Sequence, residues 1–355
     1  MNRPHKQEQE PATEEVAEVG PGVLRMQLPI SLPGLGHVNT YALVDKDGAA
    51  IVDPGLPGQT SWNALKQRLR TAGIPMRRIH TVIVTHSHPD HFGGSGRLAK
   101  ESGGELVAHA AFRTPFQARA EGPCVDPVDD VEMEDLAISQ WTAVSPWGRR
   151  SFRPPWHRRL HLRAMRLGLF TSYVEARPTR RVRHGEVIRL SGRDWTAIHT
   201  PGHTLDHLCL HDPEEGLLLA GDHVLPSITP HIAGQGGGRD PLKAFFASLD
   251  RVASLTDVKR ALPAHGHPFE DVPGRVEAIK KHHAERIEVL REAVGQLGPA
   301  TVEALSHELF RKAHWGPMAE SETYAHLEHL RLLGEAARSN RDGLAYYQLA
   351  AAERI

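Results

Sequence analysis

The chain has 355 residues, of which 40% are hydrophobic and 24% charged, and its formal net charge at pH 7 is −1. The length exceeds that of a typical single domain, so we expect a catalytic domain with an accessory region. The near-zero net charge provides no overall field for nucleic acid. No apolar stretch approaches the roughly 18 residues that a membrane span requires.

The amino terminus has no apolar region of the kind found in signal peptides. Residues 1–20 are rich in glutamate and include Pro4 and Pro11, so we predict a disordered tail. Cys124 and Cys209 are the only cysteines and lie outside any Cys-x-x-Cys spacing. This pattern indicates neither a disulfide framework nor a thiolate zinc site, and the predicted location is the cytoplasm.

The most informative segment is Thr-His-Ser-His-Pro-Asp-His at residues 85–91, which follows an apolar run at residues 79–84. The run predicts a buried strand, so the polar residues lie on the loop that leaves its carboxyl end. Imidazole and carboxylate groups are ligands that Zn²⁺ accepts in catalytic sites. One ion needs only three or four such groups, and the chain offers more further on, which indicates two metals.

Further candidate ligands lie in turns later in the chain, and two of them directly follow strand-like stretches. His203 comes after residues 195–198, Asp222 comes after residues 217–219, and His265 lies in the sequence Pro-Ala-His-Gly-His. This order of strand-end ligands resembles the metallo-β-lactamase-fold hydrolase superfamily from about residue 22 to 270, and several independent motifs agree in type and order.

The resemblance implies an α/β (α+β) fold, an αββα sandwich over residues 21–270. It also implies a two-metal centre. One metal would be bound by His86, His88 and His203, and the other by Asp90, His91 and His265. Asp222 would bridge the two metals. A shared carboxylate and hydroxide neutralise the repulsion between two cations, and bound water loses its proton near neutral pH. Asp90 and Asp222 are the predicted catalytic residues, which orient the hydroxide or accept its proton.

We expect two zinc ions per chain, with iron or manganese as alternatives. Diiron redox members of the superfamily place a glutamate at the second ligand position, where this chain has His88. Some glyoxalase-like sulfur dioxygenases share the His-x-His-x-Asp-His pattern with a single iron, so imidazole and carboxylate ligands leave that branch open.

Two other residues are expected to lie behind the ligands. Asp53, before Pro54-Gly55, matches the first turn of the family, where an aspartate fixes the orientation of a ligand imidazole. Turn chemistry alone is the alternative explanation for this aspartate. His207 belongs to a Gly-His-Thr-x-Asp-His pattern seen in the glyoxalase-like and endoribonuclease branches. Its alternatives are a substrate contact and a structural hydrogen bond.

Residues 112–182 are interpreted as an insertion in the catalytic domain. Arginines recur between Arg149 and Arg183 against a single acidic residue, Glu175. We expect a lid that attracts an anionic substrate, because guanidinium groups bind phosphate and carboxylate with two donors. The alternative is a solvated face that pairs with the acidic stretch before it.

Residues 271–355 show helical spacing. We predict a helix that ends at Gly298, a second helix capped by Thr301, a third capped by Ser321, and a turn at residues 340–343 that enters a strand. This order resembles the winged-helix appendage of β-lactamase-like endoribonucleases. The third helix carries few cations, which favours packing or dimerisation over DNA binding.

The predicted function is hydrolysis of a thioester or ester of an anionic small molecule or acyl carrier by a metal-bound hydroxide, as the glyoxalase-like branch implies. The alternatives are RNA phosphodiester hydrolysis and iron-dependent persulfide dioxygenation. A binding protein built on the winged helix is a further class, which the complete ligand set disfavours. The expected partners are therefore the substrate, with RNA as an alternative, and a second copy of the chain in a homodimer, but no membrane.

Overall fold

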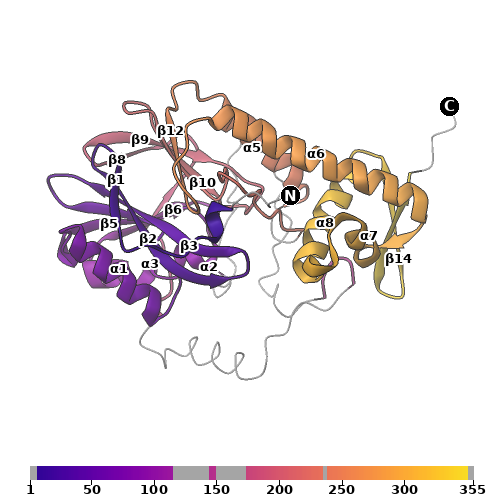
Figure 1. The fold of residues 1–355 in the computed structure, drawn as a ribbon, viewed down its shortest axis with the longest axis horizontal. Coiled ribbons are helices and arrows are strands. Elements are labelled where there is room, and N and C mark those ends of the chain that lie inside the picture. The colour runs from indigo at the N-terminus through magenta and orange to yellow at the C-terminus, as the bar shows by residue number, and fades with distance from the viewer. Residues whose placement is uncertain (1–5, 115–143, 149–172, 235–237, 351–355) are drawn as a thin grey trace.

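The protein is described here by a computed structural model of residues 6–114, 144–148, 173–234 and 238–350. Within these ranges the strands form a sandwich of two mixed sheets, with a smaller sheet in the C-terminal region (Figure 1). The first sheet follows chain order: β1 Val16–Gly20, β2 Val23–Leu32, β3 Leu35–Val44, β4 Ala49–Val52, β5 Ile79–Val84, β6 Glu105–His109 and β7 Arg180–Val182.

The second sheet has the order β12-β11-β10-β9-β8. Its strands are β8 Val187–Leu190, β9 Arg193–His199, β10 Leu208–Asp212, β11 Leu217–Gly221 and β12 Arg260–Pro263. Helices α1 Gln59–Thr71 and α3 Ser95–Ser102 pack on the outer face of the first sheet, and α5 Pro241–Ala253 and α6 Val272–Leu297 pack on the outer face of the second. This gives the αββα layering that the resemblance implied.

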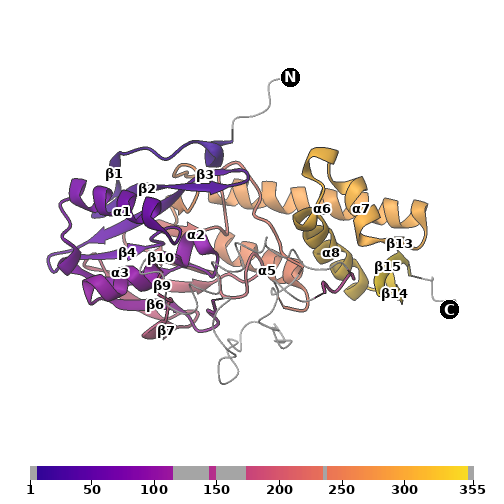
Figure 2. The ribbon, with the colours of Figure 1, turned by 90° about the horizontal axis from the view of Figure 1, so that it is seen from below.

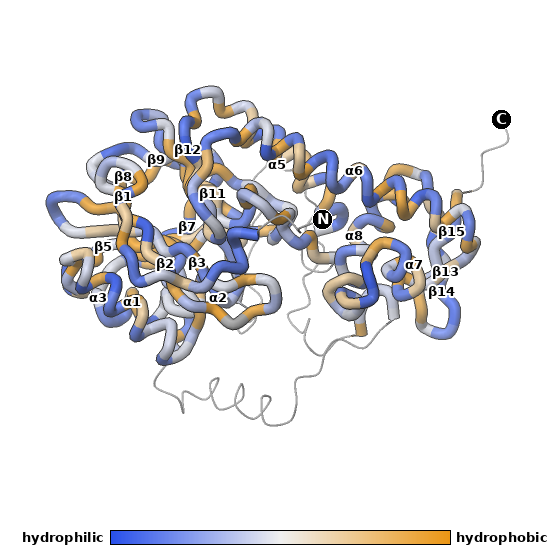
Figure 3. Tube along the Cα trace, viewed as in Figure 1, coloured by the Kyte–Doolittle hydropathy of each residue, from blue (hydrophilic) through white to orange (hydrophobic). Residues whose placement is uncertain are grey.

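Strand β4 shows why both faces of the first sheet are apolar. Ala50 and Val52 are buried against the second sheet, whereas Ala49 and Ile51 are buried against the helical layer. Alternate residues of a strand point to opposite faces, so a strand covered on both sides must be apolar throughout. Figure 3 shows the resulting hydrophobic strands in the interior of the sandwich.

The strand directions bring the predicted ligand loops to one edge. Strands β4 and β5 are parallel. Strand β9 is antiparallel to β10, β10 is antiparallel to β11, and β11 is parallel to β12, so β9, β11 and β12 run in one direction. The loops that leave their carboxyl ends therefore meet at the same edge of the second sheet. The short helix α2 Pro89–Phe92 follows β5 directly.

Helix α6 runs from the sandwich into the C-terminal region (Figures 1 and 2). That region contains helical elements and a small sheet: α7 Val302–Leu309, η3 Lys312–His314, α8 Pro317–Leu332, β13 Ala300–Thr301, β14 Ala336–Arg341 and β15 Leu344–Leu349. In the described part of the chain, no helix has the length and apolar character needed to cross a bilayer.

Most of the predicted C-terminal element ends are confirmed. Helix α6 is followed by Gly298, Thr301 caps α7 by accepting from the Ala304 N–H, and β15 follows the predicted turn. The cap predicted at Ser321 is wrong, because α8 begins four residues earlier at Pro317. Proline is favoured in the first turn of a helix because the N–H that it lacks would have no partner there.

The prediction of a disordered tail at residues 1–20 is wrong for residues 6–20. The short helix η1 Gln7–Gln9 precedes β1, and Glu8 is fully buried. Its carboxylate accepts from the backbone N–H groups of Ser227 and Ile228 at 2.8 and 3.1 Å and from the Ser227 hydroxyl. The amino-terminal segment therefore holds the loop that follows β11 through hydrogen bonds, which apolar patterning does not reveal.

The predicted insertion is shorter at its carboxyl end than residues 112–182. Residues 180–182 form β7, which pairs with β6 in the first sheet. Residues 115–143 and 149–172, with the arginines from Arg149 to Arg166, lie outside the described residues. The described residue Trp147 donates to Glu320 of α8 at 3.1 Å and packs on Tyr324, so this part of the insertion contacts the C-terminal region.

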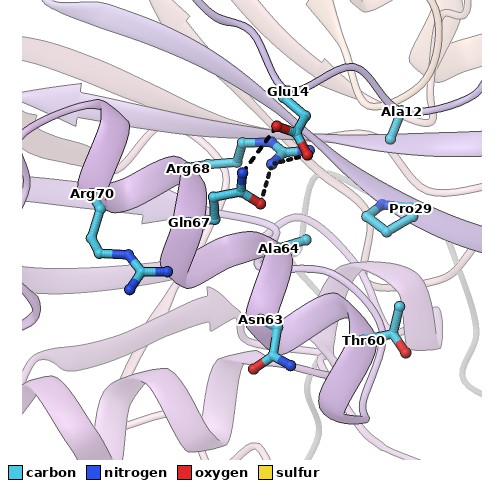
Figure 4. Close-up of a pocket in the computed structure, with 9 residues that line it drawn as sticks. All are labelled: Ala12, Glu14, Pro29, Thr60, Asn63, Ala64, Gln67, Arg68 and Arg70. Atoms are coloured by element: carbon cyan, nitrogen blue, oxygen red, sulfur yellow. Dashed lines mark hydrogen bonds and ion pairs between the residues drawn. The ribbon is translucent and has the colours of Figure 1, made fainter.

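A hollow of about 570 Å³ lies over α1, away from the predicted ligands (Figure 4). Arg68, one of the residues that line it, donates to the Thr13 carbonyl at 2.9 Å and to the Gln67 side chain at 3.0 Å. Its cation is thus engaged in tying the amino-terminal segment to α1.

We expect Glu8→Ala to lower the free energy of unfolding by about 1–3 kcal/mol, because the N–H groups of Ser227 and Ile228 lose their buried acceptor. Denaturant unfolding followed by fluorescence measures the change. Glu15→Ala removes an exposed carboxylate and should change stability by less than about 0.5 kcal/mol. Equal effects of the two substitutions would contradict the role of Glu8.

Candidate metal centre

The loop after β5 positions its ligands through the start of α2. His88 is the N-cap of this helix and Pro89 is its first residue, so Asp90 and His91 lie on the first turn. The fixed φ of proline favours this turn. His86 precedes the helix in a bend and His88 caps it in extended backbone, so the segment presents ligands to two neighbouring positions.

The first group of ligands contains His86, His88, His203 and Asp222, whose ligand atoms all lie within 4.8 Å of one another. The Nε2 atoms of His86 and His203 are each 3.0 Å from His88 Nδ1. These side chains come from the loops after β5, β9 and β11. The structure thus brings together the residues that the resemblance assigned to one metal.

The second group contains Asp90, His91 and His265. Asp90 Oδ2 lies 3.6 Å from His91 Nε2 and 3.5 Å from His265 Nε2. Asp222 lies between the groups, because its Oδ2 is 3.5 Å from both His203 Nε2 and His91 Nε2, and its Oδ1 is 3.3 Å from His265 Nε2. All seven predicted ligands therefore converge on one site.

Buried atoms without hydrogen-bond partners test whether this site fits metal ions. Across the described ranges, His91 Nε2, His265 Nε2 and Asp222 Oδ1 are buried and have no hydrogen-bond partner. A buried polar atom left in this state costs about 1–3 kcal/mol. A cation at each group would satisfy these atoms, and the imidazole and carboxylate set suits zinc, iron or manganese. The residues therefore fit a two-metal centre.

The protonation of the ligands follows from burial and charge. Burial, with neighbouring imidazoles, holds the pKa values of His86 and His88 well below 6.5, so these rings are neutral. Burial opposes the charged form of His91 as well, but Asp222, Asp90 and Asp53 outweigh it and raise its pKa well above 6.5. A metal must displace that proton, so metal binding should release protons near neutral pH.

Asp53 supports two of the ligands, as the sequence predicted. Its Oδ2 accepts from His91 Nδ1 at 2.8 Å and from the Thr85 hydroxyl at 2.7 Å. Because the Thr85 hydroxyl donates to this carboxylate, its oxygen accepts from His86 Nδ1 at 3.0 Å. Both imidazoles thus donate from Nδ1 and direct Nε2 towards the metal groups, and metal binding would remove the second proton of His91 from its Nε2. Asp53 adopts a φ of 52°, a conformation that asparagine and aspartate tolerate better than most residues.

Backbone carbonyls support two further ligands, and no sequence motif marks these carbonyls. His265 Nδ1 donates to the His37 carbonyl at 2.6 Å, and His203 Nδ1 donates to the His231 carbonyl at 2.7 Å. A carbonyl is present in every residue, so no residue type marks such a partner. Thr85 could have been found from its position between the strand and His86.

His207 makes a structural hydrogen bond. Its Nε2 accepts from the Asp222 backbone N–H at 3.0 Å, so its Nδ1 donates to the Thr200 hydroxyl at 2.7 Å. Both ring nitrogens are therefore occupied in holding the turn that carries Asp222. Asp206 accepts from the Ser87 hydroxyl at 2.9 Å, and burial raises the pKa of its carboxyl to about 6.

We expect Asp53→Asn to weaken metal binding by roughly 10–100-fold while the fold is retained. An amide nitrogen placed towards His91 cannot accept its Nδ1 proton, which favours the ring form whose Nε2 is protonated and cannot bind metal. Competition with a chromogenic chelator measures the affinity. Asp45→Asn alters a similar pair, in which His80 Nε2 lies 3.3 Å from Asp45, outside the site, and should leave the affinity unchanged. Unchanged affinity in Asp53→Asn would contradict this role.

Comparisons with known proteins agree with this geometry. The Metallo-beta-lactamase superfamily profile matches residues 33–265. The chain is 26% identical over 328 residues to the "Probable metallo-hydrolase YqjP" of Bacillus subtilis, covering 88% of this chain and 93% of the relative.

Solved structures extend the similarity over nearly the whole chain. A metallo-beta-lactamase family protein from Thermus thermophilus has a TM-score of 0.73 and 29% identity, covering 93% of this chain and 99% of that one. A beta-lactamase domain protein from Burkholderia ambifaria has a TM-score of 0.75 and 26% identity, covering 96% of both chains. The ligand geometry and these similarities together show that the chain belongs to the metallo-beta-lactamase superfamily and is a metallo-hydrolase of that fold.

Proposed function

We propose that the protein is a dizinc hydrolase that cleaves a thioester or ester of an anionic small molecule or acyl carrier. The observation that supports this proposal is the pair of ligand groups that share Asp222, with buried ring nitrogens of His91 and His265 left without partners in the described structure. Zinc matches the ligand chemistry of histidine and carboxylate.

The residues of the site have different roles in the proposed reaction. When bound, two metals supply a water that is deprotonated near neutral pH and a positive charge for the oxygen of the substrate carbonyl. Asp90 and Asp222 carry negative charge within the two ligand groups, so they would hold the metals and orient the attacking water. His86, His91 and His265 are fully buried, which excludes bulk water from the inner side of the centre.

The open side of the centre lies near His88 and His231. Both residues are partly exposed, whereas the other predicted ligands are buried. The His231 side chain is 24% exposed, and its backbone carbonyl contacts His203. We expect the substrate to approach the metals over these two rings.

The anionic character of the substrate is proposed from the arginine-rich sequence. Of the arginines in the described ranges, Arg181 donates to the Ala110 and Phe112 carbonyls at 3.0 Å, and Arg177 pairs with Glu175 at 2.9 Å. These two side chains are therefore engaged in contacts within the protein, at and just before the edge strand β7 of the first sheet. We propose that the arginines between residues 149 and 166, which lie outside the described ranges, attract the substrate.

RNA hydrolysis remains the second candidate because two metals can also hold the attacking and leaving oxygens of a phosphodiester. The order α7, α8 and the β14–β15 hairpin agrees with the winged-helix-like arrangement that we propose for this region. However, α8 is buried over nearly all of its residues from Ala319 to Leu330. A helix so enclosed has no free face to place in a nucleic-acid groove, so we favour the thioester or ester substrate.

We expect His86→Ala to abolish turnover while the protein stays folded, because the three-histidine group loses a buried ligand. Removal of metal with a chelator should have the same effect on the unmodified protein, and added zinc should restore turnover. Hydrolysis rates, metal content and circular dichroism provide the measurements. His80 lies on β5, the strand that leads into the ligand loop, and belongs to neither ligand group, so His80→Ala is the control and should retain activity.

A substrate panel of acyl-thioesters, esters and single-stranded RNA separates the candidate reactions. We expect hydrolysis of acyl-thioesters or esters, faster for acyl groups that carry a carboxylate or phosphate, and no cleavage of RNA. Cleavage of RNA without thioester or ester hydrolysis would replace the proposal. Oxygen consumption with a thiol persulfide by an iron-loaded protein would instead identify a dioxygenase.

A further inference from the structure

Residues 223–234, here called the 223–234 loop, directly follow one predicted metal ligand, Asp222. Near its other end the loop contains the residue that supports a second ligand, His203. Asp222 directly precedes the loop, and the His231 carbonyl accepts from His203 Nδ1 at 2.7 Å. The position of His231 therefore sets the orientation of the His203 ring. What holds His231 in place is a residue of the C-terminal region.

Helix α8 contacts this loop through two hydrogen bonds and through close packing. Glu322 Oε2 accepts from His231 Nδ1 at 3.2 Å, and Ser321 Oγ accepts from the Gly234 backbone N–H at 3.0 Å. Gly234 packs so closely that an added Cβ would lie 2.5 Å from the Ser321 carbonyl and 2.6 Å from the Tyr324 ring. Ile232 is fully buried in the same apolar cluster as Ala325 of α8. The loop is thus fitted against the helix over residues 231–234.

Glu322 is itself fixed by α6. Arg286 Nη1 donates to Glu322 Oε1, while Oε2 accepts from His231. Burial would raise the pKa of the Glu322 carboxyl, but His231 and Arg286 outweigh burial and hold the pKa well below 4.5. The carboxylate is therefore ionised and engaged by a cation on one oxygen and by the loop histidine on the other. Such charge-assisted hydrogen bonds are stronger and more directional than neutral ones.

Glu322 also lies beside His283 and His326, and the three could be taken as another metal group. His326 Nδ1 donates to the Glu322 carbonyl at 2.8 Å, so its Nε2 accepts from His283 Nδ1 at 3.0 Å. Burial lowers the pKa of His326 to about 4, so the ring is neutral. Because Arg286 places a positive charge on the same carboxylate, we interpret this cluster as a hydrogen-bonded contact between α6 and α8, not as a cation site.

We propose that Glu322 is a positioning residue of the metal centre, which acts through His231 to orient His203 and thereby strengthens metal binding at the three-histidine group. The C-terminal region completes the centre through the order Arg286, Glu322, His231 and His203. Partners of this kind behind a ligand imidazole typically change metal affinity by about 10–100-fold. The inference rests on the proposed function only in that both need the metal centre.

The test measures metal affinity in the full-length protein without substrate. Metal-free protein is titrated with zinc in competition with a chromogenic chelator, which gives a dissociation constant for each of two ions. We expect Glu322→Ala to weaken binding of one ion by roughly 10–100-fold and to leave the other nearly unchanged. Loss of orientation at His203 affects one ligand group, whereas a general loss of stability would not select one ion.

Glu328→Ala is the matched control. Glu328 is also a buried glutamate of α8 that is held by an arginine, Arg331 at 2.8 Å, and by an aromatic hydroxyl, that of Tyr347. No contact joins it to the 223–234 loop in the described structure. We expect Glu328→Ala to lower the stability of the C-terminal region and to leave both zinc constants at their unsubstituted values.

His231→Ala provides a second route if Glu322→Ala fails to fold. This substitution keeps the His231 carbonyl and removes only the side chain that ties it to Glu322, and it leaves the Arg286–Glu322 contact intact. We expect the same selective weakening of zinc binding at one site. The double variant should bind that zinc no more weakly than either single variant, because both substitutions break one chain of contacts.

The outcomes separate this inference from the proposed function. Folded Glu322→Ala or His231→Ala protein that retains both zinc constants would overturn the positioning role and leave the hydrolase proposal standing. If the unsubstituted protein binds two zinc ions but hydrolyses no thioester or ester, the hydrolase proposal fails and the positioning role of Glu322 still stands. Equal weakening by Glu322→Ala and Glu328→Ala would also overturn the inference.

Discussion

The structure depends on the burial of imidazole and carboxylate groups at one edge of the sandwich, where His91 Nε2, His265 Nε2 and Asp222 Oδ1 have no hydrogen-bond partner in the described structure. The rings of His86 and His88 are neutral and the carboxylate of Asp222 is buried beside them, so packing these groups together is costly, and cations bound between them would offset that cost. Most of the ligand histidines have Nδ1 fixed by an acceptor, which directs Nε2 inward. The surrounding elements therefore serve to hold a set of lone pairs in place before metal arrives.

The sequence predicted those parts of the fold and site that depend on residue type and period. The apolar run at residues 79–84 forms β5, and the ligand motifs lie at the ends of β5, β9 and β11, because a side chain that must bind metal cannot be replaced by another type. Asp53 was found from its turn motif before Pro54-Gly55. These features are local, and strand direction then brings them together.

The remaining parts depend on contacts between distant segments, which leave no local pattern. The carbonyls of His37 and His231 position ligands, yet any residue could supply them. Residues 6–20 are polar and were predicted to be disordered, because Glu8 is buried through hydrogen bonds and not through apolar surface. Ser321 was expected to cap a helix, but its hydroxyl accepts from Gly234 in a loop 87 residues away.

These distant contacts converge on the 223–234 loop. Glu8 accepts from its Ser227 and Ile228 N–H groups, and Arg275 of α6 donates to its Leu225 and Ile228 carbonyls, both at 2.6 Å. Helix α8 holds the other end. A loop with few regular hydrogen bonds of its own would otherwise be mobile, and a ligand set needs a rigid support to bind metal with a fixed geometry. The amino-terminal segment and the C-terminal helices therefore hold the loop that follows Asp222 from outside the sandwich.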